Sequence, residues 1–144
     1  MSDAIAAIRD KIGASFARQG LMKTLGGRLG DVDRGVVSIE LPFSEGVTQQ
    51  HGYFHAAAVT AIADNAGGYA ALTLLDPHEE VLAVEFKINF LTPAIGERLV
   101  AEGKALRAGR TLVISQISVN AVAPGGVTLV AIMQQTNIRV AAQR

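Results

Sequence analysis

The sequence contains no cysteine and no tryptophan, and only 5% of its residues are aromatic. Without cysteine, the chain can form no disulfide framework and offers no thiol nucleophile. It also has no net charge, because 13 basic residues balance 13 acidic ones. No overall field attracts a polyanion, so neither nucleic acid nor a membrane surface is expected as a partner. With only three scattered histidines, the sequence predicts no metal site.

Apolar residues, in contrast, are abundant and make up 49% of the 144 positions. This length and composition are typical of one domain with a packed core. No linker, repeat or low-complexity tract divides the chain, so residues 1–144 are predicted to form a single domain. Charges interrupt segment 1–20 every few residues, unlike the apolar centre of a secretory signal, and a cytoplasmic location is expected.

The run from Phe54 to Leu75 carries one full charge, Asp64, near its middle. It is about as long as a membrane span, but a charge at the bilayer centre is costly. We therefore predict a helix buried in the core, which ends before Pro77 because proline cannot continue a helix. The adjacent Gly67 and Gly68 are interpreted as a place where this helix packs closely against its surroundings.

The segments around this helix predict the rest of the fold. Apolar residues at helical spacing between Ile5 and Phe16 indicate one amphipathic surface helix, with Gly20 as a stop signal. Alternating residues after a turn near Gly35 indicate a hairpin. Turn signals then separate four strand-like segments, which are predicted to form an antiparallel meander. These segments are 80–94, 97–111, 111–126 and 127–140.

Together these elements predict an α+β fold in which a curved six-stranded antiparallel sheet wraps around the long central helix. The helix would then be buried on most sides, which explains why it is nearly free of charge. The N-terminal helix would lie on the surface.

The lone carboxylate of Asp64 requires an explanation, because burying a charge without a partner costs free energy or raises its pKa. One explanation is structural: Asp64 accepts hydrogen bonds at a helix or subunit interface, beside Asn65. The other is that Asp64 is a catalytic carboxylate in a cleft. Periodicity alone does not separate the two.

The start of the helix adds a second candidate group. A helix that begins near His55 presents unpaired backbone N–H groups and a partial positive charge, which can hold an oxyanion. Asp64 follows nine residues later, about 13 Å along the axis, so one chain cannot place both groups on one reacting atom. Two antiparallel helices at a dimer interface could do so.

At these residues the chain resembles the hotdog-fold acyl-CoA thioesterases, in the branch similar to the phenylacetate-degradation thioesterase. The shared motif is a histidine, two small residues and a helix with an acidic residue nine positions after the histidine, here His55-Ala56-Ala57 through Asp64. Segments 84–94 and 109–112 are similar to the third strand and a hairpin of that family. The resemblance covers nearly the whole chain and implies a hotdog fold.

The resemblance also implies roles for individual residues. Asp64 takes the place of the catalytic carboxylate, as a general base or as a nucleophile, and the backbone N–H of Ala56 that of the oxyanion donor. Gln49 takes the place of a polar site residue, with Gln50 as the alternative. His55 is interpreted as a helix-start residue bonded to the backbone or as a proton shuttle.

Three features of the sequence bear on this resemblance. Alanines replace the double glycine after the histidine, although a backbone N–H needs no glycine. His51-Gly52 imitates the motif but lies thirteen residues before the carboxylate. Ala83 stands where some members carry a serine, so no hydroxyl is available there to position a water.

The substrate contacts follow from the same resemblance. The residues implied to bind coenzyme A are Phe90, Thr92, Arg107, Gly109, Arg110 and Thr111. The expected acyl pocket consists of Tyr53, Phe54, Val59 and Ile62.

The expected function is hydrolysis of acyl-CoA thioesters to the free acid and coenzyme A, with no cofactor beyond the coenzyme A of the substrate. The expected assembly is a homo-oligomer, with a dimer as the catalytic unit and a tetramer as the doubled form. The alternative is a non-catalytic acyl-CoA binding protein of the same fold.

Overall fold

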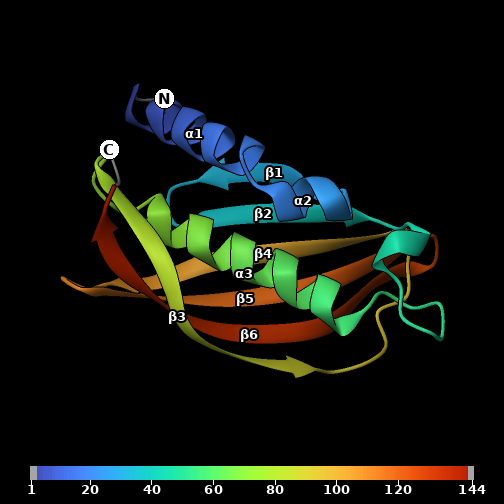
Figure 1. The fold of residues 1–144 in the computed structure, drawn as a ribbon. Helices are drawn as coiled ribbons and strands as arrows, with labels where there is room; N and C mark the ends of the chain where they lie inside the picture. The colour runs from blue at the N-terminus through green and yellow to red at the C-terminus, as the bar shows by residue number, and fades with distance from the viewer. Residues whose placement is uncertain (1–2, 143–144) are drawn as a thin grey trace.

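The structure is a computed structural model that describes residues 3–142. Six antiparallel strands form one curved sheet in the order β1-β2-β4-β5-β6-β3, and the long helix α3 lies along its concave face (Figure 1). The strands are β1 (Arg28–Asp33), β2 (Val36–Pro42), β3 (Glu79–Phe90), β4 (Arg98–Ala108), β5 (Leu112–Ala123) and β6 (Gly126–Ala141). The helices are α1 (Asp3–Ala17), α2 (Gly20–Leu25), the short 3-10 helix η1 (Glu45–Val47) and α3 (Ala56–Leu72). The predicted hotdog architecture is confirmed.

Helix α3 is buried because its small side chains let the sheet approach closely. Ile62, Ala63, Ala66 and Ala70 have no exposed surface. On β4, a side chain at Gly103 would collide with the backbone carbonyl of Ala66, so strand and helix meet backbone to backbone there. No helix within residues 3–142 is long and apolar enough to span a bilayer. The prediction of a core helix is confirmed.

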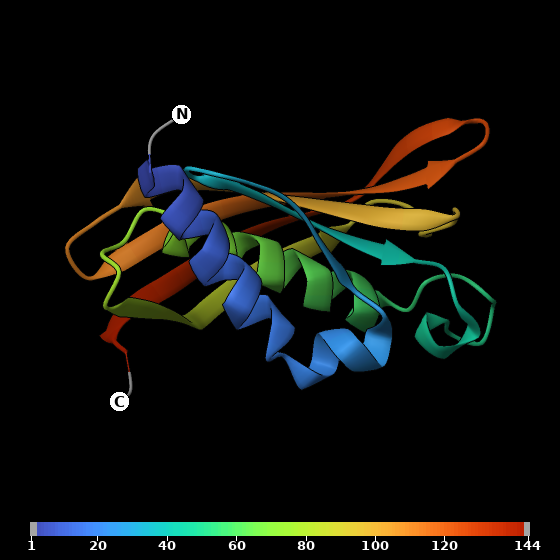
Figure 2. The same cartoon turned by 90° about the horizontal axis from the view of Figure 1, so that it is seen from above.

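The N-terminal region differs from the prediction in one respect. Helix α1 forms as expected, but it ends at Ala17, and Gly20 begins a second helix instead of stopping the first. This second helix, α2, ends at Leu25, and the next residue, Gly26, has a φ of 84°, the left-handed conformation that suits a glycine after a helix. In the view of Figure 2, α1 runs across α3 and is followed by α2.

The predicted hairpin of β1 and β2 is confirmed, with Gly35 at φ 78° in its turn. The four-strand meander is wrong in one strand. β4, β5 and β6 are consecutive neighbours, but β3 pairs with β6 at the far edge and has no contact in the sheet with β4. The turn signal Pro93-Ala94-Ile95-Gly96 lies in segment 91–97, which connects β3 to β4 across the end of the sheet. The prediction failed here because a strand pattern does not reveal which neighbour the strand takes.

The two edges of the sheet are covered differently. At the β1 edge, Arg9 of α1 donates a hydrogen bond from Nε to the carbonyl of Val32, at 3.0 Å. At the other edge, β3 exposes Leu82, Val84 and Phe86, with 61%, 55% and 43% of their surface accessible. An uncovered, apolar edge strand is a surface on which another chain can pair.

Candidate active site

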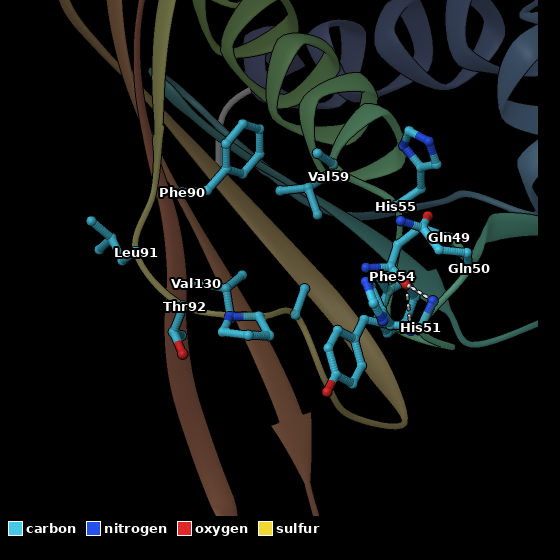
Figure 3. Close-up of a pocket in the computed structure, with 14 residues that line it drawn as sticks. Gln49, Gln50, His51, Phe54, His55, Val59, Phe90, Leu91, Thr92 and Val130 are labelled. Carbon is cyan, nitrogen blue, oxygen red and sulfur yellow. Dashed lines mark hydrogen bonds between the residues drawn. The ribbon is translucent and has the colours of Figure 1, made fainter.

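A pocket of about 610 Å³ opens at the start of α3 (Figure 3). Loop 48–55, the first turn of α3 and the segment that follows β3 form its walls. It brings together the expected site residues Gln49, Tyr53, Phe54, His55, Ala56, Val59, Phe90 and Thr92, and also Gln50. The side chains of Phe90 and Val59 point toward one another, so the wall between them is apolar.

His55 is the residue before the helix and caps it. Its Nδ1 accepts a hydrogen bond from the backbone N–H of Ala57 at 2.9 Å, and its carbonyl accepts from Ala58 and Val59. The interpretation of His55 as a helix-start residue bonded to the backbone is thereby confirmed. Among residues 3–142, the N–H of Ala56 has no acceptor and is free to hold an anion at the positive end of the helix dipole.

The side chain of Gln49 is held by the loop in which it lies. Its Oε1 accepts hydrogen bonds from the backbone N–H groups of His51, at 2.5 Å, and Tyr53, at 3.3 Å. Within the described part of the chain its Nε2 has no acceptor, so this amide can donate to a bound carbonyl. Gln50 is exposed at the pocket rim. Gly52, at φ 82°, belongs to a loop turn, so His51 does not begin a helix.

Asp64 lies in a different pocket, of about 260 Å³, on the side of α3 that faces α1 and β3. Its Oδ1 accepts a hydrogen bond from Nε2 of Gln135 at 2.7 Å. Burial raises the pKa of the Asp64 carboxyl above its ordinary value, and the hydrogen bond from Gln135 acts in the opposite direction. A half-buried carboxylate that is partly held by a neutral donor can act as a base or as a nucleophile.

Two groups of expected site residues line neither of these pockets. Ile62 is fully buried in the core and lines neither pocket. The β4–β5 hairpin lies at the opposite end of the sheet from the start of α3 (Figure 1). Arg107 and Arg110 are exposed on this hairpin. Arg139 holds the backbone of the hairpin, since its guanidinium donates to the carbonyl of Gly109 and its backbone N–H donates to the carbonyl of Thr111.

Sequence reasoning missed Gln135 and Asn137 on β6. Both are buried, with 1% of their surface accessible, and Asn137 donates a hydrogen bond to Oε1 of Gln135. The period-two pattern of a strand held the signal, since it places both residues on the face of Ala131 and Met133. Amides on an otherwise apolar inner face indicate a polar partner on the central helix.

A metal centre has no support in the part of the chain that the structure describes, where no three histidine or acidic side chains cluster. The polar groups that line the two pockets include the carboxylate of Asp64, the side-chain amide of Gln49 and the free backbone N–H of Ala56. These are groups that transfer protons and stabilise an oxyanion.

The fold and these groups define a hotdog protein with an acidic residue on its central helix. Residues 51–128 match the family described as the Thioesterase superfamily, and the chain belongs to this superfamily. Its class of activity is therefore thioester hydrolysis.

Known relatives agree with this assignment. A crystal structure of a thioesterase family protein from Silicibacter pomeroyi is 38% identical, with a TM-score of 0.91, over 94% of this chain and 99% of that one. The 1,4-dihydroxy-2-naphthoyl-CoA hydrolase of Listeria monocytogenes is 26% identical over 69% of this chain and 81% of that protein. The PaaI protein of the phenylacetic acid degradation operon of Escherichia coli shares the fold, with a TM-score of 0.84 and 18% identity over 96% of this chain and 97% of that one.

Proposed function

We propose that the protein hydrolyses acyl-CoA thioesters at sites shared between two copies of the chain. The observation that carries this proposal is the separation of two complementary groups on one helix. The free N–H of Ala56 and the carboxylate of Asp64 open into different pockets of the same chain. A second copy whose α3 runs antiparallel would bring the carboxylate of one chain to the helix start of the other.

In this site the thioester carbonyl accepts hydrogen bonds from the N–H of Ala56 and the free amide of Gln49. Asp64 of the other chain then removes a proton from water, the water oxygen bonds to the carbonyl carbon, and the C–S bond breaks. The thiolate of coenzyme A leaves and takes up the proton. Alternatively, Asp64 attacks directly, expels the thiolate and forms an anhydride that water hydrolyses. Neither route needs a cofactor.

Coenzyme A as the leaving group is supported by the chemistry of the first pocket. Its volume of about 610 Å³ suits a long, partly apolar arm, and Phe90 and Thr92 line it. The match to a naphthoyl-CoA hydrolase supports the same class of thioester. Arg107 and Arg110 are exposed at the end of the sheet away from this pocket, so they would meet the phosphates of coenzyme A bound at the helix start of the other, antiparallel chain.

The direct test is release of thiol from a panel of aromatic, short and medium acyl-CoA thioesters. Asp64→Asn keeps the shape of the side chain and the acceptor for Gln135 but removes the base. We expect hydrolysis to fall at least about a hundredfold. Parental rates in Asp64→Asn would contradict the mechanism. Tight acyl-CoA binding without turnover by the parent chain would favour the non-catalytic binding protein instead.

Mixing two inactive variants tests whether the site is shared. Asp64→Asn and Gln49→Ala homodimers would each lack a complete site. After subunit exchange, half of the dimers are mixed and each contains one intact site, so activity should return to about a quarter of the parental value. No recovery, with exchange verified by mass spectrometry, would place both residues in one site of one chain.

A further inference from the structure

The inner face of β6 carries a buried amide pair directly behind the carboxylate of Asp64. Gln135 donates from Nε2 to both Oδ1 of Asp64, at 2.7 Å, and the backbone carbonyl of Asp64, at 3.0 Å. Asn137 donates from Nδ2 to Oε1 of Gln135 at 2.8 Å. Both amides are 99% buried, so water has little access to the amide side of these bonds.

The orientation of the Gln135 amide follows from its partners. A backbone carbonyl can only accept a hydrogen bond, so the NH₂ group of Gln135 must face the carbonyl of Asp64. Its oxygen must then face Asn137, which can satisfy that oxygen only by donating from its own NH₂ group. Each amide therefore fixes the next, and a flip of either one would leave a buried acceptor facing another acceptor.

Gly67 provides the space that this arrangement needs. A side chain at Gly67 would collide with Oε1 of Gln135 and with the end of Ile117. A side chain at Gly68, the next residue, would meet only Oδ1 of Asn137, at 4.0 Å. Of the two glycines, Gly67 is therefore the one whose absent side chain admits the amide to the back of the helix.

We propose that Asn137 and Gln135 form a positioning relay that holds Oδ1 of Asp64 and leaves Oδ2 as the oxygen that meets the substrate. No hydrogen bond reaches Oδ2 from any residue between 3 and 142. The catalytic use of the relay rests on the proposed function. The hydrogen bonds from Asn137 to Gln135 and from Gln135 to Asp64 do not depend on it. The two residues act through Asp64 and do not touch the reacting atoms.

The first test follows the carboxyl of Asp64 directly. Carbon-detected NMR of the intact protein measures the pH at which this carboxyl titrates, without any need for turnover. Gln135→Met keeps the volume of the side chain and removes the donor, so we expect Asp64 to titrate at a higher pH than in the parent. An unchanged titration in a folded Gln135→Met variant would overturn the relay, whether or not the protein hydrolyses acyl-CoA.

The second test uses kinetics, provided that the hydrolysis proposed above is observed. The reactive form of Asp64 is ionised, so the acidic limb of the kcat profile should move to higher pH in Gln135→Met. On that limb kcat should fall about tenfold or more, the size expected for a hydrogen bond to a charged group. A fall in kcat that is equal at all pH values would mean that Gln135 only supports the fold.

Ser115→Ala is the matched control. Ser115 is fully buried on β5 and also donates a hydrogen bond to α3, from Oγ to the carbonyl of Gly67 at 3.0 Å. Its removal should lower the melting temperature but leave the titration of Asp64 where it is in the parent. If Ser115→Ala moved that titration as far as Gln135→Met, general loosening of α3 would explain both, and the relay would be wrong.

Asn137→Leu separates the second member of the relay from a direct effect on Asp64. We expect the same direction of shift as in Gln135→Met, but smaller. Because Asn137 acts through Gln135, the double variant should titrate like Gln135→Met alone. Additive shifts would show that Asn137 acts on the carboxylate directly and would overturn its place in the relay. If Gln135→Met does not fold, Asn137→Leu decides alone: a shift supports the relay, and a parental titration overturns it.

Discussion

At the scale of single residues, burying the carboxylate of Asp64 costs free energy of folding, and the same carboxylate is the proposed catalytic group. Burial raises its pKa above the ordinary value, because the ionised form is less well solvated in the folded chain than in water. The hydrogen bond from Gln135 reduces this cost without supplying a counter-charge. A carboxylate that is held by a neutral amide keeps more of its basicity than one paired with an arginine.

This cost predicts a dependence of stability on pH. The unfolded chain releases the Asp64 proton at the ordinary pKa of about 3.9, and the folded chain releases it at a higher pH. Between these two values the folded state binds more protons, so stability falls as the pH rises and stays lower at neutral pH. Asp64→Asn should therefore have a higher melting temperature than the parent at pH 7.

Thermal unfolding between pH 3 and pH 8 tests this prediction. The advantage of Asp64→Asn should shrink at acidic pH, where the parent carboxyl is protonated in both states. Asp10→Asn, at an exposed position on α1, is the control and should show no comparable change. Equal melting temperatures for Asp64→Asn and the parent at pH 7 would contradict a destabilised carboxylate.

At the scale of elements, the contact between α3 and the sheet decides which helix positions tolerate a side chain. Gly67 and Gly68 are neighbours in the same helix, yet only Gly67 faces side chains that a methyl group would displace. Their intrinsic helix preferences are the same, so any difference between them comes from packing.

The different surroundings of Gly67 and Gly68 predict that substitution by alanine has opposite effects on stability at the two positions. Gly68→Ala should stabilise the protein by about 1 kcal/mol, because alanine is the better helix former and the space is open. Gly67→Ala should destabilise it by about 1–3 kcal/mol through overpacking against Ile117 and Gln135. Urea unfolding of both variants measures the difference. Similar changes in both would mean that the sheet is not packed on α3 as described.

At the scale of the whole molecule, the uncovered edge of the sheet is where we propose that a second copy binds. Strand β3 has β6 on one side only, and its residues from 82 to 87 are exposed. Its apolar side chains are of the kind that edge strands normally avoid unless they are covered. A dimer, alone or doubled to a tetramer, would cover them.

Val84→Lys should therefore produce a monomer that has lost most of its hydrolytic activity, because each shared site needs two chains. Leu21→Lys is the matched control, since Leu21 on α2 is equally exposed, at 55%. It should leave both the assembly and the activity unchanged. Sedimentation at assay concentrations measures the assembly, and an active monomer would refute the shared site.

The sequence by itself determined most of the elements, although not the second N-terminal helix α2, and much of the first pocket. Helical spacing, alternation and turn residues are local properties, so the core helix and all six strands could be predicted from them. The capping role of His55 is local too, because its Nδ1 accepts from the backbone N–H of Ala57, two residues later in the chain. The single charge within an apolar run marked Asp64 as a candidate, and the resemblance to a known family then implied its role as the catalytic carboxylate.

Only the tertiary structure decided the relations between distant segments. No local pattern shows that β3 pairs with β6 instead of β4, or that Gln135 lies behind Asp64, 71 residues earlier in the chain. The same limit separates Gly67 from Gly68, which are alike until the sheet packs against one of them. The physical reason is that hydrogen bonds and packing between distant segments depend on where the whole chain places each group, and periodicity describes only its immediate neighbours.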